Sequence, residues 1–427
     1  MNYEKIKHSS LFTLIGLSSF QVLTMFRRGL FYTYLSIYLR DFLNLSVTET
    51  TLYATLPMIM SVLFQNFVWG PLSDKLQKRR SLIILGEILA GIGTISVWFI
   101  HYFESNYWIA GYIIIIGLSF IEIFWSMSNI AWSALISDLY PSIERSKIMG
   151  RLTSIGGFGR IIGITFGGYL YNNGFGFRNG ILFFIASLVM FLSTLPMLLA
   201  PEGGIKYLHK SNNDEVNIQH NKTHFKNKYV FIIFIIAMVF INFGRNSISI
   251  PYSQYLILDS GFDVDSVLLG FIVNTRSLAV IIIGFMAGYL SKKIGHAKTL
   301  ILGVLLAIVA LILTAAANQL FIIFIGSFII GTSEVIIYAA SYAIASILIP
   351  EEDRGKLFGV YNATFFLSWG LACTAISGPL IDYLIIRGIS EVMAYQVAFF
   401  VGAIISLVGL IIFIISEIKL WRKKKKS

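Results

Sequence analysis

Two arginines, Arg28 and Arg245, stand within long apolar stretches, and each is followed ten residues later by a Tyr-Leu pair. A guanidinium presents a planar fork of N–H donors that matches the paired oxygens of a carboxylate, phosphate or sulfate. A charge at membrane depth is costly unless it faces a partner or a wet cavity. We therefore expect both arginines to contact an anionic substrate group. The alternative is a structural role, with each arginine bonded to helix-end carbonyls or to a glutamate.

Other polar and aromatic side chains share the helical faces of these arginines or form polar stripes on two further apolar segments. The evidence is a spacing of three and four residues, which places side chains on one face of a helix. A packing role and a substrate role are equally open for Tyr338. The candidate substrate-binding residues are Arg28, Arg245, Tyr32, Gln21, Asn242, Tyr252, Asn129 and Tyr338.

Glu122 and Glu334 lie on the two polar stripes. A buried carboxylate can exchange between a proton and a neighbouring arginine, which offers a route to proton coupling. We therefore take both as candidate coupling residues. Arg27 is expected to pair with Glu122 or another acid, and Glu87 is expected to be structural. Whether Arg27, Arg160 and Arg276 bind substrate or stabilise the fold stays open at this point.

The elements that must position these residues are membrane helices. The chain has 427 residues, of which 56% are hydrophobic and only 13% charged, too few charges to cover a water-facing surface. Apolar windows of about 20 residues predict about twelve spans in an all-α, polytopic membrane protein. The windows are 12–39, 47–70, 81–101, 107–137, 147–171, 179–200, 228–257, 266–289, 298–317, 320–349, 356–385 and 394–416.

The net charge of +11 is unevenly distributed. Most Lys and Arg residues fall in the two tails and in alternate loops, which predicts cytoplasmic termini in the plasma membrane. This placement argues against nucleic acid as a partner. The six histidines lack metal-ligand spacing, and no glycine-rich phosphate-binding loop is evident. We therefore expect no cofactor, no metal and no enzyme activity.

The chain repeats itself at offsets of 209 to 218 residues. The basic segment at 70–80 returns at 288–298, and the segment at 141–150 returns at 350–359. We therefore predict two pseudo-symmetric bundles of six helices, at 1–200 and 228–427, joined by a cytoplasmic loop at 201–227. Such halves are expected to enclose a central cavity.

The basic segment resembles the loop between the second and third helices of the major facilitator superfamily. Its matching residues are Gly70, Leu72, Asp74, Lys75, Lys78 and Arg79, while Gln77 stands where the family usually has glycine. The segments beginning at Pro141 and Pro350 and the glycine-rich span at 147–171 also resemble family features. The resemblance covers nearly the whole chain and implies secondary transport by alternating access. We take Asp74, Arg79, Arg145 and Arg354 as candidate gating residues, because charge-assisted contacts can latch two halves together.

The arginine placement is similar to that of the organophosphate–phosphate antiporters, although their other signatures are not evident, so only the geometry is carried over. We expect a monomeric transporter for a small organic anion, with a proton or a counter-anion as the candidate coupling partner. The second hypothesis is an exporter of drug-like or lipid-like amphiphiles in which the arginines are structural. The third is a non-transporting sensor or scaffold on a transporter fold.

Overall fold

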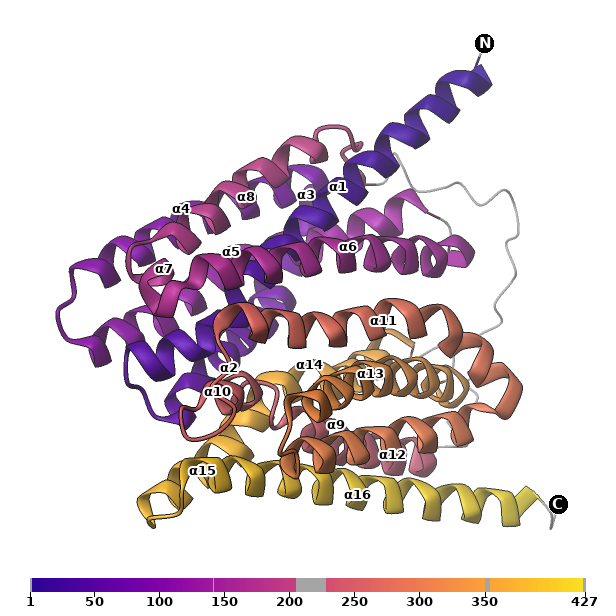
Figure 1. The fold of residues 1–427 in the computed structure, drawn as a ribbon. Helices are drawn as coiled ribbons and strands as arrows, with labels where there is room; N and C mark the ends of the chain where they lie inside the picture. The colour runs from indigo at the N-terminus through magenta and orange to yellow at the C-terminus, as the bar shows by residue number, and fades with distance from the viewer. Residues whose placement is uncertain (1, 141, 205–227, 350–353, 425–427) are drawn as a thin grey trace. The chain divides into compact units, whose positions relative to one another are not determined.

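The computed structural model describes residues 2–140, 142–204, 228–349 and 354–424, and every regular element within these ranges is a helix (Figure 1). The chain divides into two compact units. The first comprises Met1–Leu45 and Leu56–Ile218, and the second comprises Ser46–Thr55 and Gln219–Ser427.

The first unit is built mainly by five helices, with α6 and α8 packed on α1, and α5 and α8 packed on α4. Two π-helical turns, η1 and η2, follow α1 and α2. The elements are α1 (Asn2–Ile37), η1 (Tyr38–Phe42), α2 (Val47–Phe64), η2 (Gln65–Trp69), α3 (Gly70–Leu76), α4 (Arg79–Phe103), α5 (Tyr107–Leu139), α6 (Ser142–Tyr171), η3 (Asn172–Gly174), α7 (Phe175–Arg178) and α8 (Ile181–Met197).

Glycines bring α1 and α6 into direct backbone contact. A Cβ atom at Gly163 would lie 2.0 Å from the carbonyl oxygen of Phe26, and one at Gly159 would lie 2.3 Å from that of Val22. Small residues allow this close approach of two helices within a membrane. The glycine-rich sequence of α6 therefore fixes the position of the helix that carries Arg28.

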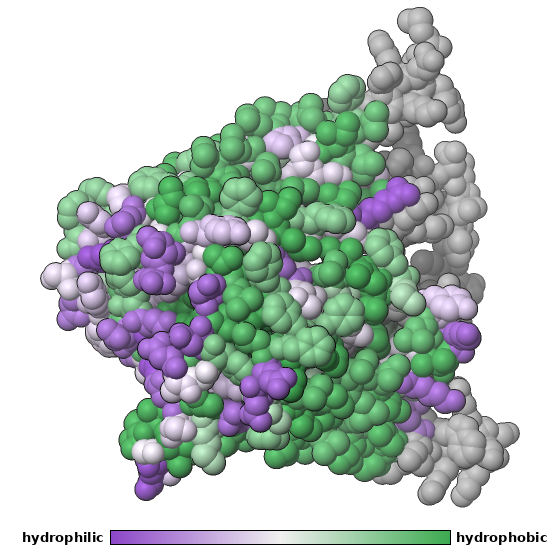
Figure 2. All heavy atoms as spheres, in the orientation of Figure 1, coloured by the Kyte–Doolittle hydropathy of each residue, from purple (hydrophilic) through white to green (hydrophobic). Residues whose placement is uncertain are grey.

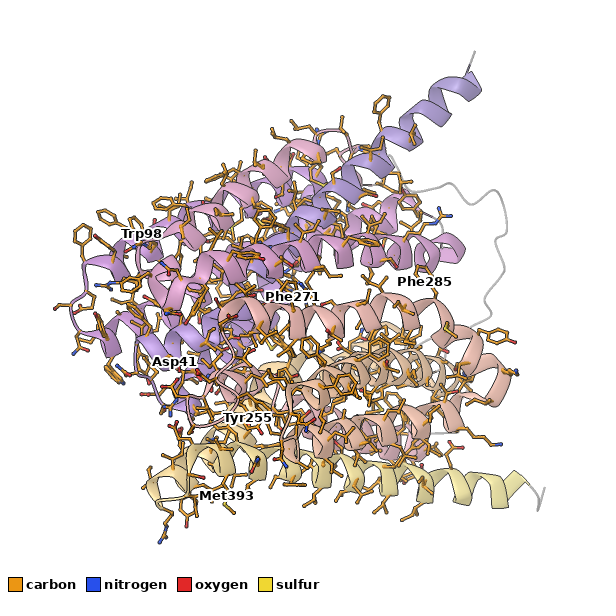
Figure 3. All side chains as sticks on the ribbon, in the orientation of Figure 1. Asp41, Trp98, Tyr255, Phe271, Phe285 and Met393 are labelled. Atoms are coloured by element: carbon orange, nitrogen blue, oxygen red, sulfur yellow. The ribbon has the colours of Figure 1, made fainter. Side chains whose placement is uncertain are left out.

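The second unit is formed by the remaining helices, in which α16 packs on α9 and α12, and α13 packs on α11 and α12. Tyr255 of α10 is buried against the ring of Phe399, whereas Phe271 and Phe285 are exposed on one side of α11 (Figure 3). The elements are α9 (Lys228–Asn246), α10 (Pro251–Ile257), α11 (Ser266–Ile294), α12 (His296–Ala315), α13 (Leu320–Leu348), α14 (Arg354–Ala372), η5 (Cys373–Ser377), α15 (Gly378–Ile386) and α16 (Glu391–Lys424).

The segment Ser46–Thr55, which begins α2, is bonded into the second unit. The carboxylate of Asp382 accepts hydrogen bonds from the backbone N–H groups of Val47 and Thr48, at 2.9 and 2.8 Å. A carboxylate at this place satisfies N–H groups that a helix N-terminus leaves free. The hydroxyl of Thr374 lies 2.7 Å from two threonine hydroxyls of the same segment. Helix α2 therefore has its first turns in one unit and its remainder in the other.

Nine helices of the described ranges are long and apolar enough to span a membrane. A pair bent by 106°, Ile148–Arg178 with Ile181–Met197, raises the number to ten if it counts as one span. The sequence predicts about twelve spans. The difference lies in this pair and in α1, whose apolar run is interrupted by Arg27 and Arg28. Figure 2 shows hydrophobic side chains over most of the visible helix surface and hydrophilic ones gathered toward helix ends.

Most of the basic segment at 70–80, which joins α2 to α4, is helical. Helix α3 occupies Gly70–Leu76, and Gln77 closes it in a left-handed conformation with φ of 56°. The backbone N–H of Gln77 donates to the carbonyl of Ser73 at 3.0 Å. Glycine adopts this conformation at little cost, which explains why the family usually has glycine at this place.

Candidate functional site

In the first unit, Arg27 of α1 and Glu87 of α4 form a buried ion pair. Their nearest charged atoms, Nη1 and Oε2, are 3.5 Å apart, and both side chains are 1% exposed. The other oxygen of Glu87 accepts hydrogen bonds from Trp125 Nε1 at 3.1 Å and from Ser128 at 2.9 Å. Because Glu87 is fully engaged, the pair joins α1, α4 and α5 and serves the fold. Arg27 thus pairs with Glu87 and not with Glu122.

Arg28, like Arg27, lies over the ring of Trp125, with Arg27 at 4.0 Å from the ring centre. The guanidinium carbon of Arg28 is 4.6 Å from the centre of the Trp125 ring, and the ring of Tyr32 is stacked parallel to Trp125 at 6.3 Å. Arg28 Nε has no hydrogen-bond partner within the described ranges. Glu122 is close enough to Arg28 and Ser61 for electrostatic interaction. The first unit therefore presents a guanidinium that is held by an aromatic platform and has a free donor.

In the second unit, Arg245 is positioned by a fully buried amide. Its Nε donates to Asn242 Oδ1 at 3.0 Å, and Asn242 in turn donates to the hydroxyl of Thr364 at 3.2 Å. The guanidinium carbon lies 5.6 Å from the centre of the Phe365 ring. Asn242 therefore orients Arg245 from beneath and is not itself a lining residue.

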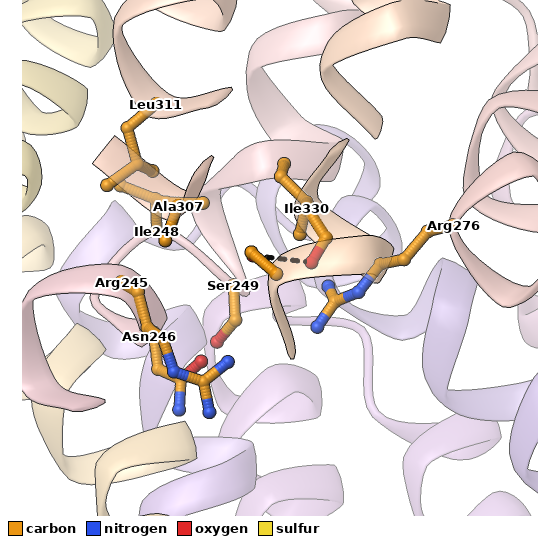
Figure 4. A pocket seen from close by; sticks show the side chains of 9 residues that line it. Arg245, Asn246, Ile248, Ser249, Arg276, Ala307, Leu311 and Ile330 are labelled. Carbon is orange, nitrogen blue, oxygen red and sulfur yellow. Dashed lines mark hydrogen bonds between the residues drawn. The ribbon is translucent and has the colours of Figure 1, made fainter. Parts of the chain in front are cut away.

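A pocket of the second unit has Arg245 and Arg276 on opposite sides, with Ser249 between them (Figure 4). Arg276 donates from Nε and Nη2 to one oxygen of Glu334, at 3.1 and 2.8 Å. Two guanidinium groups and one carboxylate leave this region with an excess of positive charge. The lining residues are Arg245, Asn246, Ile248, Ser249, Arg276, Ala307, Leu311, Ile330 and Ser333.

The other predicted substrate residues differ in their surroundings. Gln21 lies over Gly156 of α6, and Tyr252 is buried against the ring of Phe399. Asn129 accepts a hydrogen bond from Ser133 through its backbone oxygen. Tyr338 packs edge-on against Phe365, the ring beneath Arg245. The structure thus brings Tyr32 to Arg28 and Tyr338 to Arg245, and it shows no contact that adds Gln21 or Asn129 to these groups within the part of the chain it describes.

The candidate gating residues Asp74 and Arg79 bond to each other within the first unit. Arg79 Nη2 lies 3.0 Å from Asp74, its Nε lies 3.2 Å from Asp138, and its Nη1 donates to Ser73. Asp138 also accepts from the backbone N–H of Gly204 at 2.8 Å. The side chains of the other two candidates, Arg145 and Arg354, lie outside the described part of the structure.

Sequence reasoning missed Trp125 and Phe365, the rings beneath the two arginines. Trp125 follows Glu122 by three residues, so helical spacing could have placed it on the same polar stripe. Phe365 carries no such signal, because an aromatic residue in an apolar helix is usually a packing residue. Among the described residues, no group of three or more His, Cys, Asp or Glu side chains could hold a metal ion.

The sequence profile of the Major Facilitator Superfamily matches residues 17–266 and 235–427, which is nearly the whole chain. The chain belongs to the major facilitator superfamily. It is therefore a multi-pass membrane protein of a family of transporters, with the two-domain architecture of that family.

The following relatives of this major facilitator chain are distant from it in sequence. It is 26% identical over 182 residues to the "Uncharacterized transporter BU466" of Buchnera aphidicola subsp. Acyrthosiphon pisum (strain APS), which is 42% of each chain. The match thus spans about two fifths of that relative's length. A mutant of the nucleoside transporter NupG has a TM-score of 0.75 at 13% identity, covering 95% of this chain and 99% of that one.

A bacterial homologue of the human lysosomal transporter Spinster, in an inward-facing and unoccupied conformation, also has a TM-score of 0.75. Its identity is 14%, and the match covers 96% of this chain and 97% of the homologue. At these identities the solved structures establish the fold alone. The substrate must be argued from the residues of this chain.

Proposed function

We propose that this protein is a secondary active transporter that moves a small organic anion across the plasma membrane by alternating access. Arg28 of the first unit and Arg245 of the second supply the guanidinium groups that contact the anionic part of the substrate. The protein acts as a monomer with both termini in the cytoplasm, and Asp74, Arg79, Arg145 and Arg354 contribute to gating.

The observation that carries this proposal is the state of Arg245 in its pocket. Its Nε is held by Asn242, and its two terminal nitrogens make no hydrogen bond to any described residue. A guanidinium fixed at one side keeps its other donors for a ligand, and paired donors favour carboxylate, phosphate or sulfate. Arg28 is similar in having an aromatic support and an unpaired Nε.

Coupling to a proton or to a counter-anion follows from the ion pair of Arg276 and Glu334. An anion that enters beside Arg276 competes with Glu334 for the same donors. When Glu334 gains a proton, it loses its charge and releases Arg276. The donors of Arg276 are then open to the incoming anion. In the first unit, Glu122 is the corresponding carboxylate near Arg28. An exchange of this kind would link anion binding to protonation.

The proposal is tested by thermal unfolding of the purified protein with acetate, benzoate, methyl phosphate, sulfate, tetramethylammonium and a neutral detergent-like alcohol. A ligand present at 100 times its Kd stabilises the native state by about 2.7 kcal/mol. We expect stabilisation by one or more of the anions, and we expect Arg245→Lys to remove it, because lysine lacks the planar fork. The matched control is Arg387→Lys, an exposed arginine over the ring of Tyr383 at 5.2 Å.

Stabilisation by the cation or the neutral alcohol alone, unchanged in Arg245→Lys, would contradict the proposal. It would favour the exporter of amphiphilic compounds, in which the arginines are structural.

A further inference from the structure

A row of four aromatic rings begins beneath Arg245 and runs between α13 and α14; we name it the aromatic shelf and define it as Phe365, Tyr338, Tyr342 and Phe358. Ring centres are 5.5 Å apart for Tyr338 and Phe365, 6.3 Å for Tyr338 and Tyr342, and 5.3 Å for Tyr342 and Phe358. The guanidinium of Arg245 covers Phe365. The shelf therefore continues directly from the positive charge.

The two tyrosines of the shelf are open to a small molecule. Tyr338 is 52% exposed and Tyr342 is 47% exposed, whereas neighbouring Tyr361 is fully buried and bonded to Ser341. Two half-exposed aromatic residues in the middle of a membrane helix face either lipid or a polar space.

The ion pair between Glu334 of α13 and Arg276 of α11 indicates whether the two tyrosines face lipid or a polar space. Glu334 precedes Tyr338 by four residues, so the two side chains share one face of α13. The Glu334 side chain is 39% exposed and that of its partner Arg276 is 23% exposed. Partly exposed charges at membrane depth face the bundle interior or a wet cavity and avoid lipid. The exposed ring of Tyr338 therefore lies on the same face of α13 as this partly exposed charge, and we take that face to be polar and not lipid-facing.

We infer that the transported anion carries a flat aromatic ring, which lies on the aromatic shelf while its anionic group contacts Arg245. This inference rests on the proposed function and names its substrate class as aromatic organic anions. Aromatic faces attract other rings beyond simple burial of apolar area. A saturated ring of the same size has no such stacking geometry, and a small anion such as acetate reaches only the arginine.

The test uses matched probes in thermal-unfolding titrations of the full-length purified protein: benzoate with cyclohexanecarboxylate, and phenyl phosphate with cyclohexyl phosphate. We expect the aromatic member of the bound pair to have a Kd about 3- to 10-fold lower, the range expected for aromatic stacking. Tyr338→Leu and Tyr342→Leu should abolish this preference for the aromatic member of the pair. The control is Tyr383→Leu, an exposed tyrosine of α15 outside the shelf.

The outcomes separate the two proposals. Equal affinity for aromatic and saturated anions, or a preference kept in Tyr338→Leu and Tyr342→Leu, overturns the shelf inference while anion binding that depends on Arg245 still stands. Binding of none of the four anions overturns the shelf inference, and stabilisation by none of the anions, acetate, methyl phosphate and sulfate included, overturns the proposed function as well. Unchanged unfolding temperatures of the ligand-free variants show that the fold is intact.

Discussion

Arg27 and Glu87 form an ion pair in which each side chain is only 1% exposed, and Arg27 and the next residue, Arg28, both place their guanidinium carbons near the Trp125 ring, at 4.0 and 4.6 Å from its centre. Successive residues of a helix are about 100° apart, so the two arginines reach this ring from different directions, and the carboxylate of Glu87 lies beside Arg27. Arg27 therefore stabilises the contact between α1 and α4, and Arg28 is the arginine that we propose to contact the substrate.

The buried pair makes a prediction about stability. Glu87→Gln keeps an acceptor for Trp125 and Ser128 but leaves the charge of Arg27 without a partner, and removal of one partner of a buried pair costs about 3–5 kcal/mol. We expect a marked fall in the unfolding temperature of the purified protein. The double variant Arg27→Met/Glu87→Gln should recover much of the loss. A single variant as stable as the wild type would show that the pair does not hold the helices.

The contact of α1 and α6 makes a second prediction. Gly163→Ala would place a Cβ atom 2.0 Å from the carbonyl oxygen of Phe26, so the two helices must separate. We expect a lower unfolding temperature and less correctly folded protein on size-exclusion chromatography. The matched control in the same helix is Gly150→Ala, which meets no atom within 4 Å. Equal loss of stability in both variants would show that glycine itself, and not the close contact, matters.

The third prediction concerns Gln77 and is a gain in stability, where the first two are losses. A residue other than glycine in the left-handed region costs about 1–2 kcal/mol. Gln77→Gly should therefore raise the free energy of unfolding by about 1 kcal/mol, because glycine relieves this strain. Lys78→Gly is the control, since Lys78 has a negative φ of −111°. A decrease in stability for Gln77→Gly would mean that its side-chain hydrogen bond to the carbonyl of Asp74 outweighs the backbone strain.

The carboxylates make a fourth prediction, about coupling. Glu334→Gln and Glu122→Gln keep the size of the side chain and remove its titration. We expect each to reduce anion uptake driven by a pH gradient across proteoliposomes, while exchange of anion for anion persists. Glu391→Gln, at the start of α16, serves as the control. If both variants retain full pH-driven uptake, these glutamates are not coupling residues.

The sequence predicts the helices well because membrane spans are long, local and apolar. The glycines of α6 favour close packing of this helix, but the sequence does not name α1 as its partner. It does not predict that Ser46–Thr55 belongs with the second unit, because its bonds to Asp382 and Thr374 join residues more than 300 positions apart. The left-handed Gln77 also escapes prediction, since its residue type disfavours that conformation.

In the candidate site, too, some residues can be predicted from the sequence and others cannot. Arg28 and Arg245 can be named from the sequence because a charge in an apolar run is conspicuous. The partner of each arginine cannot be predicted in this way. The ion pairs of Arg27 with Glu87 and of Arg276 with Glu334 depend on how helices pack, which spacing along one helix does not reveal. The rings of Trp125 and Phe365 are missed for a related reason, because aromatic residues are common in apolar helices and only tertiary contact distinguishes a platform from packing.

Anion transport that depends on Arg28 and Arg245 is tested by counterflow in proteoliposomes loaded with unlabelled benzoate or phenyl phosphate and supplied with the same labelled anion outside. We expect the wild type to accumulate label transiently and Arg28→Lys and Arg245→Lys not to, while Arg387→Lys behaves as the wild type. Accumulation that persists in both arginine variants, or a wild type that exchanges neither anion, would contradict this expectation.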